Sequence, residues 1–129
     1  MKTLGMRKAT ARSYDEVLAA LPEILQSEGF GIVTEIDMRE TLKKKIGVDL
    51  RRYKILGACN PYFANDALAG DLDIGVMLPC NVAVYEGDDG RAVVATIDPV
   101  KAMAGHESPA IAALAAKVRA RLEQVLAKL

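Results

Sequence analysis

Residues 53–85 read YKILGACNPYFANDALAGDLDIGVMLPCNVAVY, and this stretch decides the fold. Its first seven residues alternate as a strand does, because successive side chains of an extended chain point to opposite faces. Asn60 and Pro61 then predict a helix start, with the asparagine as N-cap and the proline at the first helical position. Cys59 therefore lies where a strand passes into a helix.

The second half of the stretch predicts two more extended segments. Residues 74–78 are apolar and are expected to form a buried strand. Pro79 is expected at a bulge, an edge or a turn, and residues 80–85 continue as a strand. Cys80 shares its parity with the apolar residues of that strand. It is therefore expected to face the core if Pro79 inserts no bulge.

The N-terminal part predicts a strand, a helix, a second strand and a short helix. Residues 3–12 form the first strand, and Ser13 is typical of a capping box that begins the helix. Pro22 interrupts the apolar pattern of this helix, so we expect a kink or a break there. The second strand spans residues 30–36, and Asp37 caps the short helix that follows. The strand residues expected to face inward are Phe30, Ile32, Thr34 and Ile36.

The C-terminal part predicts a hairpin strand and a long helix. Residues 86–90 form a hairpin connection, because Asp-Gly supplies the positive φ angles that tight turns need. Residues 91–97 return as an antiparallel strand, Asp98 and Pro99 end it, and Ser108 caps the last helix. The apolar positions of this helix recur every three or four residues and are expected to cover the sheet; they are Ile111, Leu114, Val118, Leu122, Val125 and Leu129. The order of elements predicts an α+β fold, a curved antiparallel sheet with helices packed on one face.

Composition limits the class of protein. The 129 residues predict one domain, residues 1–129. Seventeen acidic and seventeen basic residues leave no net charge, whereas a dedicated nucleic-acid binder needs an excess of cations. We therefore expect no specific nucleic-acid partner, with the basic residues 43–52 on a solvated face beside acids. No segment is typical of a membrane span or a signal peptide, so we expect a cytoplasmic protein, no membrane partner and reduced thiols.

Several of these patterns occur together in one known family. They are Gly29-Phe30, Asp37, Leu56-Gly57-x-Cys59-Asn60-Pro61, Ile74-Gly75-x-x-Leu78-Pro79-Cys80-Asn81-Val82-x-Val84-Tyr85 and Asp98-Pro99. In this combination the chain resembles a family of small prokaryotic proteins that is classified as a domain of unknown function, with a fold similar to that of the TATA-box-binding protein. The resemblance implies a β-α-β4-α order and a homodimer, and marks this chain as a cysteine-containing variant. It implies no activity, substrate or catalytic residue.

Five residues are candidates for ligand binding or redox chemistry. They are the two cysteines, the asparagine after each, and the aspartate that follows the strand 91–97: Cys59, Asn60, Cys80, Asn81 and Asp98. A thiol near a helix start loses its proton more easily, and a cross-sheet thiol pair is able to bind a soft metal or sulfur species or to oxidise reversibly. The alternative is structural. Cysteine is often a small buried residue, the asparagines suit a cap and a turn, and Asp98 suits a turn that bonds its own backbone.

A soft metal ion at the thiols of Cys59 and Cys80 would need further ligands, which only His106 or a second subunit supplies. His106 alternatively lies exposed in a loop. No catalytic triad, zinc-protease motif or phosphate loop is visible, so we expect a binding protein rather than an enzyme. Two functions remain. The favoured one is a homodimeric small-ligand-binding or assembly module, and the other is a thiol site for metal, sulfur or redox chemistry.

Overall fold

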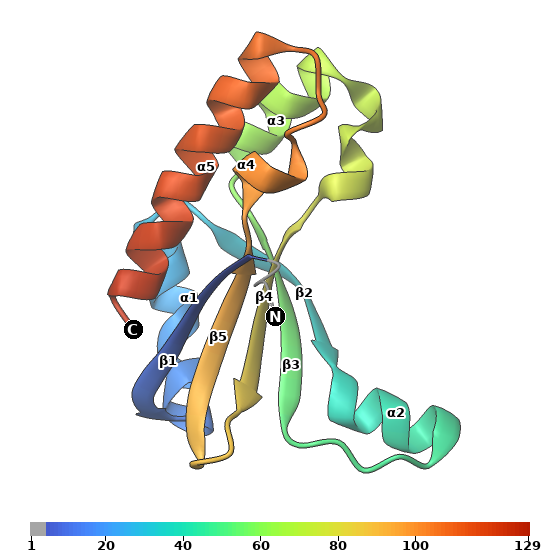
Figure 1. Ribbon diagram of the computed structural model, residues 1–129, viewed down its shortest axis with the longest axis vertical. Coiled ribbons are helices and arrows are strands. Elements are labelled where there is room, and N and C mark those ends of the chain that lie inside the picture. The colour runs from blue at the N-terminus through green and yellow to red at the C-terminus, as the bar shows by residue number, and fades with distance from the viewer. Residues whose placement is uncertain (1–4) are drawn as a thin grey trace.

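One antiparallel sheet of five strands, in the order β1-β5-β4-β3-β2, organises the molecule (Figure 1). The computed structural model describes residues 5–129, so Thr3 and Leu4 of the first predicted strand lie outside the described residues. The elements are β1 (Gly5–Ser13), α1 (Tyr14–Ser27), β2 (Gly31–Asp37), α2 (Met38–Ile46), β3 (Tyr53–Cys59), α3 (Pro61–Gly70), the 3-10 helix η1 (Leu72–Met77), β4 (Cys80–Glu86), β5 (Arg91–Ile97), α4 (Pro99–Ala102) and α5 (Pro109–Ala127). Without α2, α3, η1 and α4, this order is the β-α-β4-α order that the resemblance implied.

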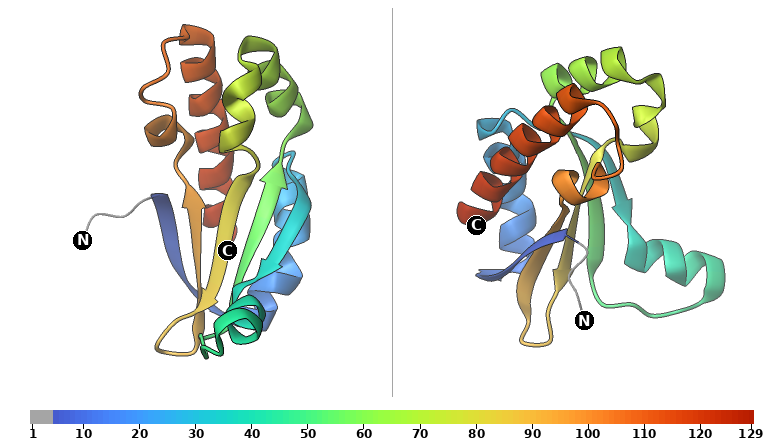
Figure 2. Two further views of the ribbon diagram at one scale, coloured as in Figure 1. Left: turned by 90° about the vertical axis from the view of Figure 1, so that its right-hand side faces the viewer. Right: turned by 45° about the horizontal axis from the view of Figure 1, so that its top comes forward.

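The two longest helices, α1 and α5, cover one face of the sheet and leave the strands exposed on the other (Figure 2, left). The main core lies between these helices and the sheet, and the side chains in it that are fully shielded from solvent include Val17, Leu21, Leu25, Val82, Val84, Val94, Leu122 and Val125. Burial of these apolar surfaces is the main force that holds the layers together. The predicted α+β class is confirmed, with α1 and α5 on one face of the sheet.

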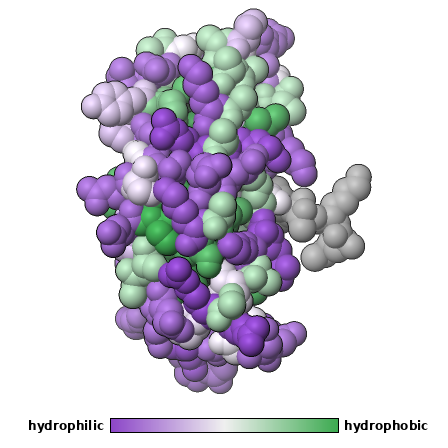
Figure 3. All heavy atoms as spheres, turned by 90° about the vertical axis from the view of Figure 1, so that its left-hand side faces the viewer, coloured by the Kyte–Doolittle hydropathy of each residue, from purple (hydrophilic) through white to green (hydrophobic). Residues whose placement is uncertain are grey.

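The outer side of this helical layer is largely hydrophilic, with hydrophobic side chains gathered near its middle (Figure 3). The opposite sheet face differs, because apolar and aromatic residues cross it in rows. Tyr53 and Tyr85 stack there with ring centroids 5.4 Å apart and planes inclined by 6°. Ile55 and Ala83 pair in the next row and are only half-buried. Helix α2 extends away from this body and buries none of its residues (Figure 1).

A second layer of helices lies beyond one end of the sheet. We call residues 61–78, which contain α3 and η1, the cap, and residues 103–108 the α4–α5 loop. The cap, α4 and the N-terminal half of α5 lie together at the top of the molecule (Figure 1). The cap and α5 share a second, smaller hydrophobic cluster around Ala67, Ile74 and Ile111. Two cores therefore meet where the sheet ends.

The segment 74–78 was predicted as a strand, and this prediction is wrong. Residues 72–77 form η1, capped by the Asp71 side chain, which accepts from the Asp73 amide at 2.9 Å. Only Ile74 is buried, whereas Leu72 and Val76 are 83% and 87% exposed. A short apolar run is compatible with a strand or a helix, and here the aspartate cap favours the helix.

The inward parity predicted for β2 holds at Phe30 and Ile32 but is wrong at Thr34 and Ile36. The register of β2 on β3 shifts between Ile32 and Thr34. A bulge adds one residue to a strand and so moves the following side chains to the opposite face. Ile36 consequently lies opposite Ile55 and is 44% exposed. In α1 the helix runs through Pro22 without breaking into two.

Candidate functional site

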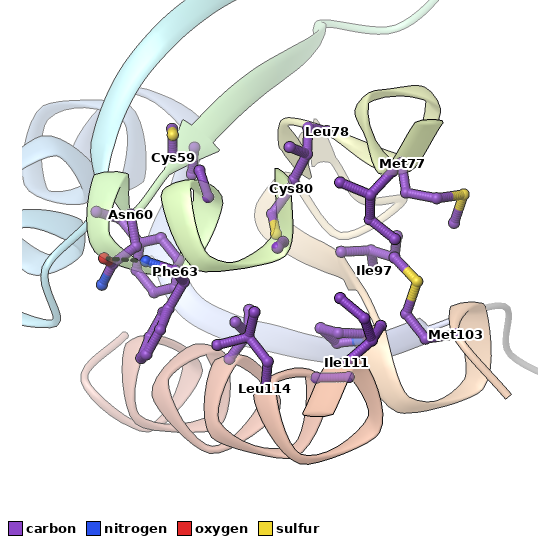
Figure 4. A pocket seen from close by; sticks show the side chains of 18 residues that line it. Cys59, Asn60, Phe63, Met77, Leu78, Cys80, Ile97, Met103, Ile111 and Leu114 are labelled. Carbon is purple, nitrogen blue, oxygen red and sulfur yellow. Dashed lines mark hydrogen bonds between the residues drawn. The ribbon is translucent and has the colours of Figure 1, made fainter. Parts of the chain in front are cut away.

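A cavity of about 60 Å³, partly open to solvent, lies between the sheet end, the cap and α5 (Figure 4). Eighteen residues line it, and they come from several separate segments of the chain between Phe30 and Val118. Their side chains are apolar apart from Asn60 and the two thiols, and none carries a carboxylate, ammonium, guanidinium or imidazole group. The apolar wall is formed by Phe63, Ile74, Met77, Leu78, Ile97, Met103, Ile111 and Leu114, among others. This space lies where the two hydrophobic cores meet, because its lining includes residues of both.

Local chemistry at the β3–α3 junction fixes one wall of the cavity. The Asn60 Oδ1 atom accepts from the amides of Tyr62 and Phe63, at 3.1 and 3.3 Å, and so caps α3 as the sequence predicted. Gly29 packs against this asparagine in the left-handed region, with φ of 85°, and a Cβ atom there would come within 2.7 Å of Asn60 Nδ2. Asn60 is therefore a structural cap whose side chain also borders the cavity.

Cys80 presents its thiol to the cavity. It lies opposite Ala58 in the β3–β4 ladder and packs against the main core, so it faces inward as predicted. In Figure 4 its sulfur points toward the cavity. Burial, the larger cause, and repulsion from the neighbouring Cys59 raise the pKa of the Cys80 thiol from 9.0 to about 11. Cys80 is therefore a neutral thiol near pH 7 and a weak nucleophile.

Cys59 occupies a different position. Its sulfur points away from the cavity in Figure 4, and the residue is half-exposed. Cys59 and Phe30 border both the cavity and a shallow surface groove between α1, β2 and the start of α3. The two residues thus form a thin wall between the interior and solvent. Both thiols are free.

Asn81 and Asp98 lie outside the cavity. Asn81 is exposed on the open face of the sheet, where it pairs with Gly57. Asp98 is only 4% exposed and caps α4, accepting from the Val100 and Lys101 amides, while Arg119 Nε donates to its Oδ2 at 3.2 Å. Burial opposes ionisation of Asp98, but the two amides and Arg119 together lower its pKa below the usual 3.8.

His106 bridges two segments at the top of the molecule instead of joining the cysteines. Its Nε2 lies 2.9 Å from Asp71 Oδ2, and its Nδ1 accepts from the Ser108 amide at 3.1 Å. The hydrogen bond with His106 is the main cause that lowers the pKa of Asp71. Over residues 5–129, no three His, Cys, Asp or Glu side chains gather as metal ligands would. The grouping of Cys59, Cys80 and His106 around a soft metal is therefore not formed within one chain.

Comparison with known proteins gives the family. The profile described as "Domain of unknown function DUF302" matches residues 6–129. The chain belongs to the DUF302 family. It is similar to the protein in "Crystal structure of uncharacterized conserved protein DUF302 from Bacillus stearothermophilus", with 28% sequence identity, a TM-score of 0.89 and 98% of each chain covered. No curated protein matches the sequence of this DUF302 protein.

The basic cluster of this DUF302 protein is largely paired with acids. Lys43 lies 3.0 Å from Asp49, Lys44 lies 3.0 Å from Glu40, and Arg51 lies 2.9 Å from Asp88. Arg52 forks between Asp15 and Glu86, at 3.1 and 2.7 Å. The cluster is thus a solvated, compensated surface. No helix among residues 5–129 has the length and apolar character needed to cross a membrane.

Several contacts and lining residues of this DUF302 protein had no signal in the sequence. Met77 and Met103 add two thioethers to the cavity wall, but each residue reaches it from a different segment. The partners of His106 and Asp98 are Asp71 and Arg119, respectively 35 and 21 positions away. Only the folded chain brings these groups together.

Proposed function

We propose that this DUF302 protein binds a small, uncharged, apolar molecule in the cavity between the cap, the sheet end and α5. The observation that supports this most is the lining, which contains no charged side chain. A charged ligand would lose its hydration without gaining a partner. An apolar ligand gains about 25 cal/mol for each Å² of apolar surface that it removes from water.

The size of the cavity limits the ligand. About 60 Å³ is far below the roughly 300–1,000 Å³ of sites for drug-sized molecules. A ligand of a few non-hydrogen atoms fits this volume. At no more than about 1.5 kcal/mol for each such atom, a ligand with three of them binds with a Kd no tighter than roughly 0.5 mM.

The test uses two matched probes, dimethyl sulfide and the trimethylsulfonium cation. In a heteronuclear NMR titration to several millimolar, dimethyl sulfide should shift the amide signals of cavity residues such as Phe63, Ile74 and Leu114. The cation should leave those signals unchanged, because the lining offers it no counter-charge. Equal shifts with both probes, or none with dimethyl sulfide, would contradict the proposal.

The thiol alternative has weaker support. Redox and metal chemistry use the thiolate, and the raised pKa of Cys80 keeps that group protonated near neutral pH. The sulfur of Cys59 points away from the cavity (Figure 4). Two free thiols fit the reducing interior of a cell, which agrees with our expectation of a cytoplasmic protein.

We also propose a homodimer formed through the open face of the sheet. One row of paired residues on this face runs from Arg7 through Ala95, Ala83 and Ile55 to Ile36. The only charge in this row is Arg7, at the β1 edge, where its guanidinium lies 3.4 Å from the Tyr85 hydroxyl. A second copy presents the same row, which is uncharged from Ala95 to Ile36, whereas nucleic acid would require cations along it.

The dimer has a direct test. Light scattering at micromolar concentration should report twice the 13.9 kDa chain mass. Ile55→Glu, which places a carboxylate in the centre of the face, should halve that mass. The matched control Ala120→Glu places the same charge on the exposed side of α5 and should remain dimeric. A monomeric wild type, or a dimeric Ile55→Glu variant, would remove this face from consideration.

A further inference from the structure

We propose that the cavity is gated, and that the contact between Asp71 and His106 is the latch that keeps the cap closed over it. This inference rests on the proposed function, because it concerns access to the same cavity. It assigns a role to His106 that is neither metal binding nor catalysis. The latch joins the cap to the α4–α5 loop, two segments that are separated by two strands in the sequence but lie side by side at the top of the molecule (Figures 1 and 2).

Each partner of the latch is bonded to residues that line the cavity. On the cap side, the Asp71 amide donates to the Ala67 carbonyl at 3.0 Å, and the Ile74 amide donates to the Asp71 carbonyl at 3.1 Å. On the loop side, the His106 amide donates to the Met103 carbonyl at 2.9 Å. Ala67, Ile74 and Met103 are all part of the lining. A movement at the latch is therefore transmitted directly to both sides of the cavity.

One protonation form of the imidazole satisfies both of its contacts. Nδ1 accepts from the Ser108 amide, so it carries no proton in this arrangement, and Nε2–H donates to Asp71. Ser108 in turn caps α5, accepting from the Ile111 amide at 3.3 Å. The side chains of His106 and Asp71 are 23% and 33% exposed, so the latch is partly shielded from water. Within residues 5–129, no other hydrogen bond or ion pair between side chains joins the cap to the α4–α5 loop.

The cap is held by fewer buried apolar residues than the main core. Its 3-10 helix η1 is a short element with poor hydrogen-bond geometry. The second hydrophobic cluster, which holds the cap, contains three buried residues, against fifteen in the main core. Regions with few buried apolar contacts open locally at lower free energy than the core. The geometry therefore favours separation of the cap from α5 as the route by which a ligand reaches the cavity.

The Cys80 thiol reports this opening without any ligand. A Cys59→Ser background leaves Cys80 as the only thiol, and its alkylation by N-ethylmaleimide at pH 8 should be slow while the cap narrows the cavity, because the residue is partly buried. Two variants break the latch. His106→Ala removes the imidazole, and Asp71→Ser keeps an N-cap side chain for η1 but is too short to reach His106. The matched control Glu35→Ser breaks the 2.7 Å pair with Lys54 on β2 and β3, far from the cap.

Both latch variants should label Cys80 roughly tenfold faster than the background protein, which corresponds to about 1.4 kcal/mol. The control should label at the background rate, and the double latch variant should be little faster than either single one, because both remove one interaction. An unchanged labelling rate in both latch variants would overturn the proposal. The proposal would also be overturned if the acceleration, converted to a free energy, equalled the loss of global stability measured by denaturant unfolding, because labelling would then follow global unfolding.

The background protein alone supplies a second readout if a latch variant does not fold. Labelling through a local opening should depend on denaturant much less steeply than global unfolding does. Labelling with the full global dependence would mean that Cys80 becomes exposed only when the whole chain unfolds, and would overturn the gate. This result is independent of the dimethyl sulfide titration, so a failed gate and a failed binding site are distinguishable.

Discussion

Replacing Ala58 by valine should stabilise this DUF302 protein, because the new methyl groups enter the cavity. Ala58 lies in β3, has no exposed surface and lines the cavity. Valine adds two carbons, each worth about 0.8 kcal/mol when buried, and is favoured in strands. The expected gain is therefore about 1.5 kcal/mol in the free energy of unfolding. If the cavity has no room for the two added carbons beside Ala58, the substitution overpacks the core and instead costs about 1–3 kcal/mol.

Ala92 provides the matched control. It lies in β5, is equally inaccessible to solvent and belongs to the main core, but it does not line the cavity. Ala92→Val adds the same two carbons away from the cavity, in the main core, and should destabilise the chain by about 1–3 kcal/mol because cores are close-packed. Urea unfolding followed by far-UV circular dichroism at one fixed protein concentration measures both changes, since the stability of a dimer depends on concentration. Equal destabilisation by the two substitutions would refute the cavity as described.

Three other substitutions test the packing and the ionised groups. Leu122→Ala, at a fully buried position of α5, should lower the free energy of unfolding by about 2–5 kcal/mol. Leu72→Ala, at an exposed position of η1, should change it by less than about 0.5 kcal/mol. Similar losses from the two substitutions would contradict the packing of α5. The pKa of Cys80 is raised to about 11 in the folded state, so the unfolded chain loses the thiol proton first as the pH rises. The free energy of unfolding should therefore fall between about pH 9 and 11, by at most about 3 kcal/mol more than that of Cys80→Ala. A parallel decline in the Cys80→Ala variant would show that other groups cause it. Asp98→Asn should lower the free energy of unfolding by about 1–3 kcal/mol at pH 7, measured by denaturant unfolding. Because folding lowers the pKa of Asp98, this difference should shrink as the pH falls below about 4. A difference that stays constant would exclude the Asp98 charge as its origin.

Local chemistry made most of the elements predictable. The capping box of Ser13 and Glu16 forms as expected, with bonds of 3.0 and 3.2 Å. Asn60 begins α3 because its side-chain oxygen meets amides two and three residues ahead. Such caps act within one turn of helix, so the information for them lies in neighbouring residues. The amphipathic pattern of α5 was equally readable, and its residues Val118, Leu122 and Val125 are buried.

The predictions for β2 and for residues 74–78 were wrong because contacts with residues distant in the sequence determine the structure of these segments. The bulge in β2 depends on how that strand pairs with β3, and no residue of β2 alone specifies it. The run 74–78 had an apolar composition suited to a strand, but its only buried side chain, Ile74, packs against Ala67 and Ile111 of two other helices. Asp71 is a favourable N-cap residue for η1, but the apolar composition of residues 74–78 led to the prediction of a strand.

The candidate site was predicted only in part for the same reason. Cys80 was expected to face the core, and the structure places its thiol at the cavity (Figure 4). The cavity itself could not be expected, because its lining is drawn from segments between residues 30 and 118. His106 and Asp98 were singled out as the lone histidine and as a turn acid. Their partners could be found only in the folded chain.

Xenon is the most direct probe of the central claim, that an apolar cavity is available to a small ligand. Crystals of the protein pressurised with xenon should show one bound atom in the cavity, in contact with the side chains of Phe63, Cys80 and Leu114, because dry apolar cavities take up this gas. The Ala58→Val variant, treated in the same way, should show none. Ordered water in the cavity of the wild-type protein, or the absence of xenon from it, would contradict the account.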